Sequence, residues 1–292
     1  MAANGKILVS GASGNVGGSL LKHLAAAGVE VRALTHDESK ASALEGRGIG
    51  AFVGDLARPE TLADAFEGVD RVFHLTPNSP EGTTLGANLI DAAKGSGNEV
   101  RVVRLSTLKA SREGPSRLSK QHAEVEDALT SSGLSYTILR PVYYMQNTMA
   151  VARSVASEGK IYQPLGEGRI GMIDARDIAE VAARVLTEEG HEGNTYTLTG
   201  PASISYYDVA AALSEALDKQ VTYVEVPLDA AREAMAGEGF PEWLAGAVIE
   251  WAEAFREGYG DFTTEDVERL TGHRATSYER FASDFAQVFR GG

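Results

Sequence analysis

Short apolar runs of strand length alternate with amphipathic stretches through the first half of the chain. The apolar runs are Ile7–Val9, Val29–Leu34, Ile49–Val53, Arg71–Leu75, Val100–Leu105 and Tyr136–Leu139. The stretches with apolar residues at helical spacing are Val16–Leu24, Pro59–Phe66, Thr83–Lys94 and Ser116–Leu129. Strands and helices in alternation form right-handed crossovers, which cover both faces of a parallel sheet. The pattern therefore predicts an α/β fold with a doubly wound parallel sheet of the Rossmann type.

The pattern changes after Met149. The later candidates are a helix over Ala175–Leu186, a strand over Tyr196–Leu198, a helix over Ser205–Leu217, a strand over Val221–Val226 and helical sequence from Leu228 onward. Late segments of this kind commonly build a smaller lobe over the carboxyl ends of the main sheet. We therefore expect a Rossmann domain over residues 1–157, with 170–200 completing its sheet. Residues 158–169 and 201–292 form the smaller, mostly helical lobe.

Composition narrows the function classes. The 292 residues include 27 Lys and Arg against 41 Asp and Glu, a net charge of −14, and no Cys. The absence of cysteine excludes thiol catalysis, thiolate metal sites and disulfides. The acidic balance argues against direct binding of nucleic acid or of anionic membranes. No segment reaches the ~18 consecutive apolar residues of a membrane span, so we expect a cytoplasmic protein.

A glycine-rich turn follows the first strand directly and opens the first helix. Its glycines are Gly11, Gly14 and Gly17, in the spacing GxxGxxG. Gly11 allows a tight turn, Gly14 lets backbone N–H groups approach a pyrophosphate, and Gly17 permits close packing of helix on strand. Unpaired N–H groups and the helix dipole both favour an anion at that helix end. The turn therefore predicts a dinucleotide site.

The turn belongs to a series of motifs along the whole chain. They are Gly11–Gly17, Val31–Leu34, Gly54–Leu56, Leu75–Pro77, Ser132–Pro141, Ile173–Ala179, Leu198–Pro201, Thr263–Val267 and Leu270–Gly272. Together they resemble the NmrA-like branch of the atypical short-chain dehydrogenase/reductases. That family contains NAD(P)H-dependent quinone and dye reductases, and also redox-sensing regulators that bind the dinucleotide without turning it over.

The end of the second strand bears on which dinucleotide is bound. Relatives that prefer NADP usually have Arg where His36 stands, often with a basic residue near Lys40. His36 and Lys40 can receive a 2′-phosphate, whereas the carboxylate of Asp37 favours the ribose hydroxyls of NAD. We expect NADP(H), with NAD(H) as the alternative. Asp55 and Leu56 resemble the pair that contacts adenine in the family.

The resemblance also implies the remaining cofactor contacts. They are Ser13, Asn15 and Val16 at the turn, and Leu75, Thr76, Pro77, Ser106 and Lys120 around the nicotinamide and its ribose.

The acid that ordinary short-chain reductases use is missing. These enzymes place a Ser after the fifth strand and a Tyr-x-x-x-Lys on the next helix, where the Tyr protonates the developing alkoxide. Ser106 and Lys120 match two of these positions, but Ser116 stands where the Tyr belongs. Conventional carbonyl chemistry through this helix is therefore doubtful. Our candidates for catalytic roles are Ser106, Lys120 and Tyr143.

Two residues of this helix have structural alternatives. Lys120 either reaches the nicotinamide ribose or forms a surface pair with Glu124, four residues later. His122 lies near the apolar face of the helix, so it is either a packing residue or a proton donor.

The substrate side is expected after the sixth strand, because ligands bind at the carboxyl ends of such strands. Tyr143, Tyr144, Met145 and Asn147 follow Arg140-Pro141, and in the family the residues after Arg-Pro border the nicotinamide and substrate. The alternative is that these aromatic residues simply cover the core.

The remaining groups of polar residues give weaker indications of function. Asp174 and Asp177 have the spacing of an N-cap and N3 pair before an Ala-rich helix. Six histidines are scattered without a His-x-x-x-His pair, so we expect no metal site.

These residues favour an oxidoreductase that passes hydride from NAD(P)H to a quinone or a conjugated aromatic carbonyl. A quinone asks little of the protein beyond positioning. The alternative is a non-catalytic, NAD(P)-sensing regulator that acts through a protein partner. The sequence leaves open whether the chain forms a homodimer.

Overall fold

The computed structural model describes residues 5–291, which fall into two compact units. The first comprises the described residues through Glu113, with Leu118–Arg140 and Ile178–Tyr196. The second comprises Gly114–Arg117, Pro141–Asp177 and the described residues from Thr197 onward. The domain boundaries predicted from the sequence, a Rossmann domain and a smaller substrate lobe, stay a prediction.

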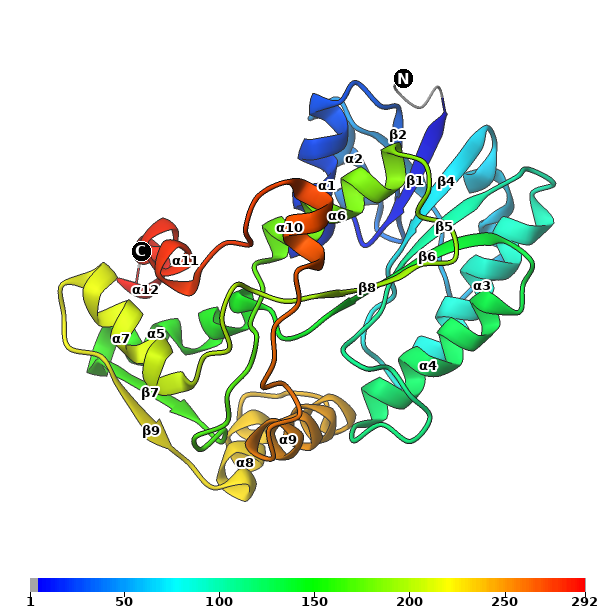
Figure 1. Cartoon of the computed structure of the whole chain (residues 1–292). Helices are drawn as coiled ribbons and strands as arrows, with labels where there is room; N and C mark the ends of the chain where they lie inside the picture. The colour runs from blue at the N-terminus through cyan, green and yellow to red at the C-terminus, as the bar shows by residue number, and fades with distance from the viewer. Residues whose placement is uncertain (1–4, 292) are drawn as a thin grey trace. The chain divides into compact units, whose positions relative to one another are not determined.

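A seven-stranded sheet organises the first unit (Figure 1). Its spatial order is β3 (Gly50–Val53), β2 (Val31–Thr35), β1 (Lys6–Ser10), β4 (Val69–His74), β5 (Arg101–Leu105), β6 (Ser135–Pro141) and β8 (Thr195–Leu198). The five pairings from β3 to β6 are parallel. The predicted doubly wound parallel sheet is confirmed. Strand order reverses between β1 and β4, and such a switch point opens a ligand crevice at the carboxyl ends of the strands.

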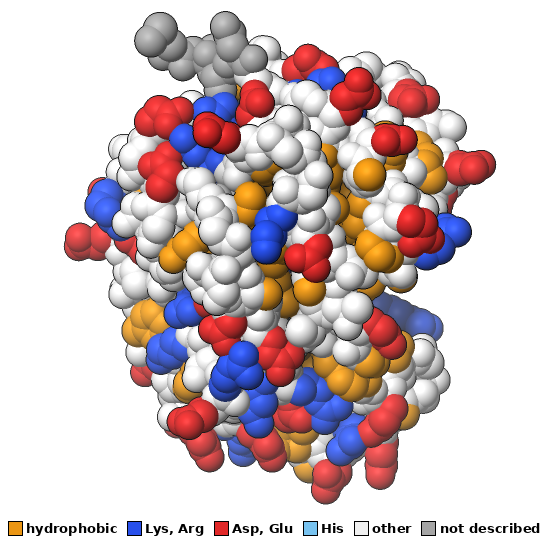
Figure 2. Space-filling view, turned by 90° about the vertical axis from the view of Figure 1, so that its right-hand side faces the viewer, with side chains coloured by type: hydrophobic (Ala, Val, Ile, Leu, Met, Phe, Trp, Pro, Cys, Tyr) orange, Lys and Arg blue, Asp and Glu red, His pale blue; other side chains and the backbone are white. Residues whose placement is uncertain are grey.

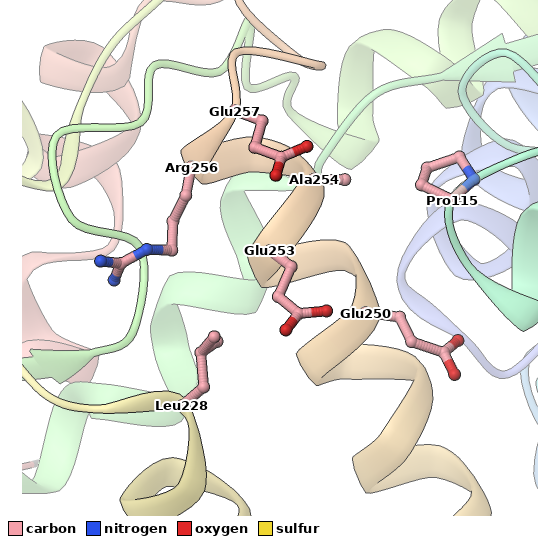
Figure 3. A pocket seen from close by; sticks show the side chains of 7 residues that line it. All are labelled: Pro115, Leu228, Glu250, Glu253, Ala254, Arg256 and Glu257. Atoms are coloured by element: carbon pink, nitrogen blue, oxygen red, sulfur yellow. The ribbon is translucent and has the colours of Figure 1, made fainter.

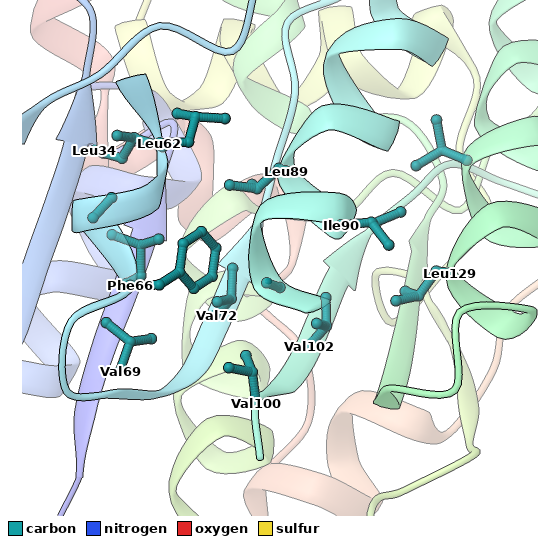
Figure 4. Close-up of a cluster of buried hydrophobic side chains, with 14 residues drawn as sticks. Leu34, Leu62, Phe66, Val69, Val72, Leu89, Ile90, Val100, Val102 and Leu129 are labelled. Carbon is teal, nitrogen blue, oxygen red and sulfur yellow. The ribbon is translucent and has the colours of Figure 1, made fainter. Parts of the chain in front are cut away.

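Helices cover both faces of this sheet. They are α1 (Asn15–Ala26), α2 (Glu38–Glu45), α3 (Gly82–Gly95), α4 (Arg117–Thr130) and α6 (Ala175–Thr187), with the 3-10 helices η1 (Pro59–Thr61) and η2 (Ala63–Phe66). Figure 1 shows α3 and α4 on one face of the sheet and α1 on the other. The core under α3 and α4 is a cluster of buried side chains that includes Phe66, Val72, Leu89 and Leu129 (Figure 4).

One local expectation is corrected, and one helix was not expected. The stretch Pro59–Phe66 is not one helix but η1 and η2, because the Thr61 hydroxyl bonds Arg58 O and the N–H of Asp55 and so competes with the helical pattern. The sequence pattern also missed α2. That helix buries only Ala41 and Leu44, which is too few for a periodic signal.

The second unit is mostly helical. Its elements are η3 (Met145–Val151), α5 (Ala152–Glu158), β7 (Lys160–Gln163), α7 (Tyr206–Leu217), β9 (Thr222–Glu225), α8 (Leu228–Gly237), α9 (Glu242–Arg256), α10 (Asp266–Thr271), α11 (Tyr278–Asp284) and α12 (Ala286–Phe289). Strands β7 and β9 form a parallel two-stranded sheet, of which only β9 was expected. No helix within residues 5–291 combines the length and the apolar character that a membrane span needs.

Candidate active site

The glycine turn has the geometry that the sequence predicts. Gly11 adopts the left-handed conformation with φ +69°, and a Cβ there would lie 2.6 Å from Leu75 Cδ2. A Cβ on Gly17 would lie 2.2 Å from the carbonyl oxygen of Gly11, so α1 packs directly on the turn. No other amino acid fits these two positions without movement of the backbone or of Leu75.

The N-terminus of α1 is open to an anion. Its N-cap is Gly14, which offers no side-chain hydrogen bond, and its first turn contains no acidic residue. The first N–H groups of a helix have no partner within the helix and lie at the positive end of its dipole. The turn between Gly11 and Gly17 and the uncapped end of α1 therefore suit a pyrophosphate. The residues expected to flank it are Ser13, Asn15 and Val16.

At the end of β2, the Asp37 carboxylate is already engaged. Its Oδ1 accepts hydrogen bonds from the N–H groups of Ser39 and Lys40 at 2.8 and 3.2 Å, and from the Ser39 hydroxyl at 2.5 Å. The Ser39 and Lys40 bonds hold the pKa of Asp37 below its usual value. Asp37 is thus the N-cap of α2 through Oδ1. His36 and Lys40 are exposed beside it.

At the end of β3, Asp55 and Leu56 are fixed by local bonds. Asp55 Oδ1 accepts from the Ala57 N–H at 2.9 Å, and Oδ2 accepts from Arg58 Nε at 3.2 Å. These bonds, with the nearby charge of His36, lower the pKa of Asp55, with the Ala57 bond contributing most. The Asn88 amide holds the Leu56 carbonyl at 2.7 Å. Arg58 is a cation at this edge that sequence reasoning missed, and its position three residues after Asp55 was the available signal.

The end of β4 is tied to both neighbouring strands. The Leu75 N–H donates to Ser10 Oγ at 2.8 Å, which joins β4 to β1. On the other side, Arg104 of β5 donates to Thr76 Oγ1 at 3.2 Å and to the carbonyl of His74 at 3.3 Å. Thr76 is buried and Pro77 is exposed. Polar groups of β1 and β5 therefore hold the segment from His74 to Thr76, which is expected to flank the nicotinamide.

Ser106 lies at the end of β5 in a buried ionic cluster. Its hydroxyl donates to Glu126 of α4 at 2.5 Å, and Arg140 of β6 binds both oxygens of the same carboxylate. Ser106 and Glu126 are 4% and 6% exposed. Since a serine has one hydroxyl hydrogen, Ser106 in this arrangement offers only lone pairs to a ligand.

On α4, the residues around the absent tyrosine differ in exposure. Ser116 is fully buried, whereas Lys120 lies on the exposed side of the helix. Glu124 accepts a hydrogen bond from Thr83 at 2.7 Å, and no ion pair joins it to Lys120 within residues 5–291. The alternative of a surface pair for Lys120 is thus not supported.

His122 is buried beside a cation. Its Nδ1 lies 3.2 Å from Arg104 Nη2, and burial, followed by the Arg104 charge, lowers the pKa of His122 well below its usual value. His122 is therefore neutral at physiological pH and is a poor proton donor.

The start of α4 is anchored by α9. Glu250 accepts from the Arg117 N–H at 2.7 Å and from Nε and Nη2 of the same residue at 2.9 and 2.6 Å. The Arg117 guanidinium also lies over the Trp243 ring. Glu250 thus places a carboxylate at the N-terminus of α4, where the helix dipole favours negative charge.

Tyr143 belongs to an aromatic cluster in the second unit. Its hydroxyl lies 3.2 Å from that of Tyr206, and its ring meets Phe255 edge to face at 5.8 Å. Trp251 stacks on Phe255, and Tyr223 packs on Tyr206. Burial raises the pKa of Tyr143, against the hydrogen bonds with Tyr206 and Asn147, so the phenol stays protonated. Tyr206 was missed by sequence reasoning, although it follows the Leu198–Pro201 motif closely.

The other residues expected at the substrate side are not equivalent. Tyr144 is half-buried and Asn147 is exposed. Met145 is 1% exposed, and its N–H donates to the Ile173 carbonyl at 2.8 Å. Met145 is therefore a buried residue that fixes the backbone of the segment after β6.

Asp174 and Asp177 divide the predicted capping role. Asp174 caps α6 by accepting from the Arg176 N–H at 2.8 Å. Asp177 does not complete a capping box, because its carboxylate instead accepts from the N–H and hydroxyl of Thr276 at 2.7 and 2.9 Å. Asp177 is therefore a link to the C-terminal segment, which no local spacing could reveal.

A separate cavity of about 540 Å³ lies within the second unit (Figure 3). It is lined by Pro115, Leu228, Glu250, Glu253, Ala254, Arg256 and Glu257. Glu250 and Glu253 come from α9 and Glu257 is its C-cap residue, and none of the residues expected at the substrate side lines the cavity. Within residues 5–291, no group of three or more His, Asp or Glu side chains is arranged so that it could hold a metal ion.

The parallel sheet and the glycine turn against an uncapped helix define a dinucleotide-binding protein of the Rossmann class. The model of the NmrA-like family matches residues 3–282, and the chain belongs to this family. The resemblance seen in the sequence is confirmed.

Individual relatives extend over nearly the whole chain. The NAD(P)H azoreductase of Xenophilus azovorans is 38% identical over 284 residues, which are 97% of this chain and 99% of that protein. The NADPH-dependent quinone oxidoreductase of Escherichia coli, solved with NADPH, has a TM-score of 0.87 at 28% identity and covers 96% of this chain and 99% of its own. The triphenylmethane reductase of Citrobacter sp., solved with NADP(H), has a TM-score of 0.84 at 28% identity with the same coverage.

Proposed function

We propose that this protein is an NADPH-dependent reductase that passes hydride to a quinone or another conjugated aromatic acceptor. The observation that carries the proposal is the intact glycine turn against an uncapped α1, in a chain that matches an NAD(P)H azoreductase over 97% of its length. The reductases among the relatives support the predicted activity. NAD(H) stays the alternative cofactor.

In this proposal the first unit holds the dinucleotide along the carboxyl edge of its sheet. The backbone around Gly14 binds the pyrophosphate, and His36 and Lys40 meet the 2′-phosphate. Thr76 and Lys120 flank the nicotinamide ribose. When bound, the dinucleotide supplies the hydride.

On the acceptor side, we assign positioning to Tyr143 and its aromatic neighbours. A buried serine stands at the position of the usual acid, and both Ser106 and His122 are poorly suited to give up a proton. Hydride transfer to a quinone gives a delocalised hydroquinone anion, so positioning and a neutral donor such as the Tyr143 hydroxyl suffice.

The direct test follows loss of NADPH absorbance with a panel of quinones and azo dyes, and repeats it with NADH. We expect turnover with at least one aromatic acceptor and a higher kcat/KM for NADPH than for NADH. Tight NADPH binding without oxidation by any acceptor would refute the reductase.

The second candidate is a sensor that binds the oxidised dinucleotide and a protein partner, which the buried Ser116 in place of the catalytic tyrosine favours. It requires tighter binding of NADP⁺ than of NADPH in calorimetry. Direct nucleic-acid binding is not part of either proposal, because acidic side chains are interspersed with basic ones on the face in Figure 2 and the net charge is −14. The cytoplasmic location and a homodimer stay predictions.

A further inference from the structure

Arg104 is a charged residue in the interior of the first unit. It lies near the end of β5, is 1% exposed, and is among the largest fully buried side chains of the described chain. Its Nη1 donates to the His74 carbonyl and to Thr76 Oγ1 at 3.3 and 3.2 Å, and its Nη2 meets His122 Nδ1 at 3.2 Å. Because a guanidinium is always protonated in proteins, this position holds a permanent positive charge.

The surrounding histidines add no charge of their own. Burial lowers the pKa of His74 and of His122 well below the usual value, and the charge of Arg104 lowers both further. A guanidinium can only donate, so His122 Nδ1 is the acceptor and the ring proton sits on Nε2. Among these three side chains, Arg104 alone is therefore charged at neutral pH.

Thr76 connects this charge to the ligand edge of the sheet. Its oxygen accepts from Arg104, so its hydroxyl hydrogen remains available to a ligand. Thr76 follows Leu75, whose side chain limits the space at Gly11. The guanidinium therefore lies directly behind the segment to which the proposed function assigns the nicotinamide half of the cofactor.

We infer that Arg104 makes the site prefer the reduced dinucleotide over the oxidised one, an inference that rests on the proposed function. The nicotinamide ring carries a positive charge when oxidised and none when reduced, while the phosphates are the same. A fixed cation behind the ring repels only the oxidised form, and this repulsion is stronger in a buried, low-dielectric setting. Arg104 is a positioning residue that favours entry of the hydride donor and release of the spent cofactor.

The inference is tested by calorimetry of NADPH and NADP⁺ binding to the full chain, with the ratio of the two Kd values as the readout. His122→Glu places a carboxylate against Arg104 and offsets its charge, whereas His122→Gln keeps a neutral acceptor. We expect His122→Glu to reduce the preference for NADPH by roughly three- to tenfold and His122→Gln to preserve it. Arg104→Met and Arg104→Lys form a second matched pair, with loss of the preference only in the Met variant.

Two failures are distinguishable. An unchanged Kd ratio in both His122→Glu and Arg104→Met overturns the inference and leaves the proposed function standing, because both dinucleotides still bind. If the wild-type chain binds neither dinucleotide, the proposed function is wrong and the inference is overturned with it. Circular dichroism of each variant confirms folding, and the conservative variants are the reference where Arg104→Met is unfolded.

Discussion

The Ser106 hydroxyl donates its hydrogen to Glu126 over 2.5 Å, in a cluster that Arg140 completes. Ordinary short-chain reductases use a serine at this strand end. Here the hydroxyl hydrogen is bonded to the buried carboxylate of Glu126. Ser106, a catalytic candidate from the sequence, therefore has the contacts of a structural residue.

Ser106→Ala tests this commitment. We expect kcat with the best quinone to change by less than about threefold, and stability to fall by about 1.5–3 kcal/mol, because a hydrogen bond to a charged group is lost. Steady-state kinetics and urea unfolding measure the two effects. A kcat lower by a hundredfold or more, at unchanged stability, would show that Ser106 takes part in the chemistry.

Removal of the Glu126 carboxylate leaves Arg140 without its bidentate partner. We expect Glu126→Ala to lower the free energy of unfolding by about 3–5 kcal/mol, the range for breaking a partly buried ion pair. Glu126→Gln keeps the size and one acceptor and is expected to cost less. Equal unfolding midpoints for wild type and Glu126→Ala would contradict this account.

Tyr143 is expected to act through its hydroxyl. Tyr143→Phe keeps the edge contact with Phe255 but removes the hydroxyl that is proposed to meet the acceptor, so we expect the KM for the aromatic acceptor to rise by about three- to tenfold with NADPH binding unchanged. Tyr206→Phe is the matched control, because it removes the same pair from the other side. An effect of equal size in the control would assign the change to the Tyr143–Tyr206 hydrogen bond and not to direct contact of the Tyr143 hydroxyl with the acceptor.

The 2′-phosphate prediction concerns two exposed residues. Removing a cation from a phosphate weakens binding of NADPH but not of NADH, so we expect His36→Ala and Lys40→Ala to raise the Kd for NADPH by roughly three- to thirtyfold. The Kd for NADH is the internal control. Parallel losses for both dinucleotides would instead indicate contact with the adenine or ribose.

The buried His122 predicts a pH dependence of stability. Its pKa is lowered, first by burial and then by Arg104, so the unfolded chain binds a proton more readily than the folded one below about pH 6.5. Stability is therefore complete above that pH and is lost as the pH falls toward the folded pKa. We expect His122→Gln to reduce the drop in Tm between about pH 7.5 and 5.5 by about 2–4 °C. Identical pH profiles for the two proteins would contradict this.

The fold was largely predictable because the parallel strands bury both faces and read as apolar runs. The glycine turn was predictable for the same local reason, since Gly11 and Gly17 are fixed by sterics within one strand–turn–helix unit. The Arg104 cluster and the Asp177–Thr276 bond were not, because their partners come from distant parts of the chain. Periodicity shows where a polar residue lies on an element but not which polar residue it meets.

The contact between Arg117 and Glu250 has a consequence for synthesis. Its two residues are 133 positions apart, yet the carboxylate binds the first amide of α4. At roughly 5–20 residues per second on the ribosome, Glu250 emerges on the order of ten seconds after Arg117. Until then the Arg117 N–H lacks this carboxylate partner. The contacts of Arg117 are therefore completed only when the C-terminal segment that carries Glu250 has been made.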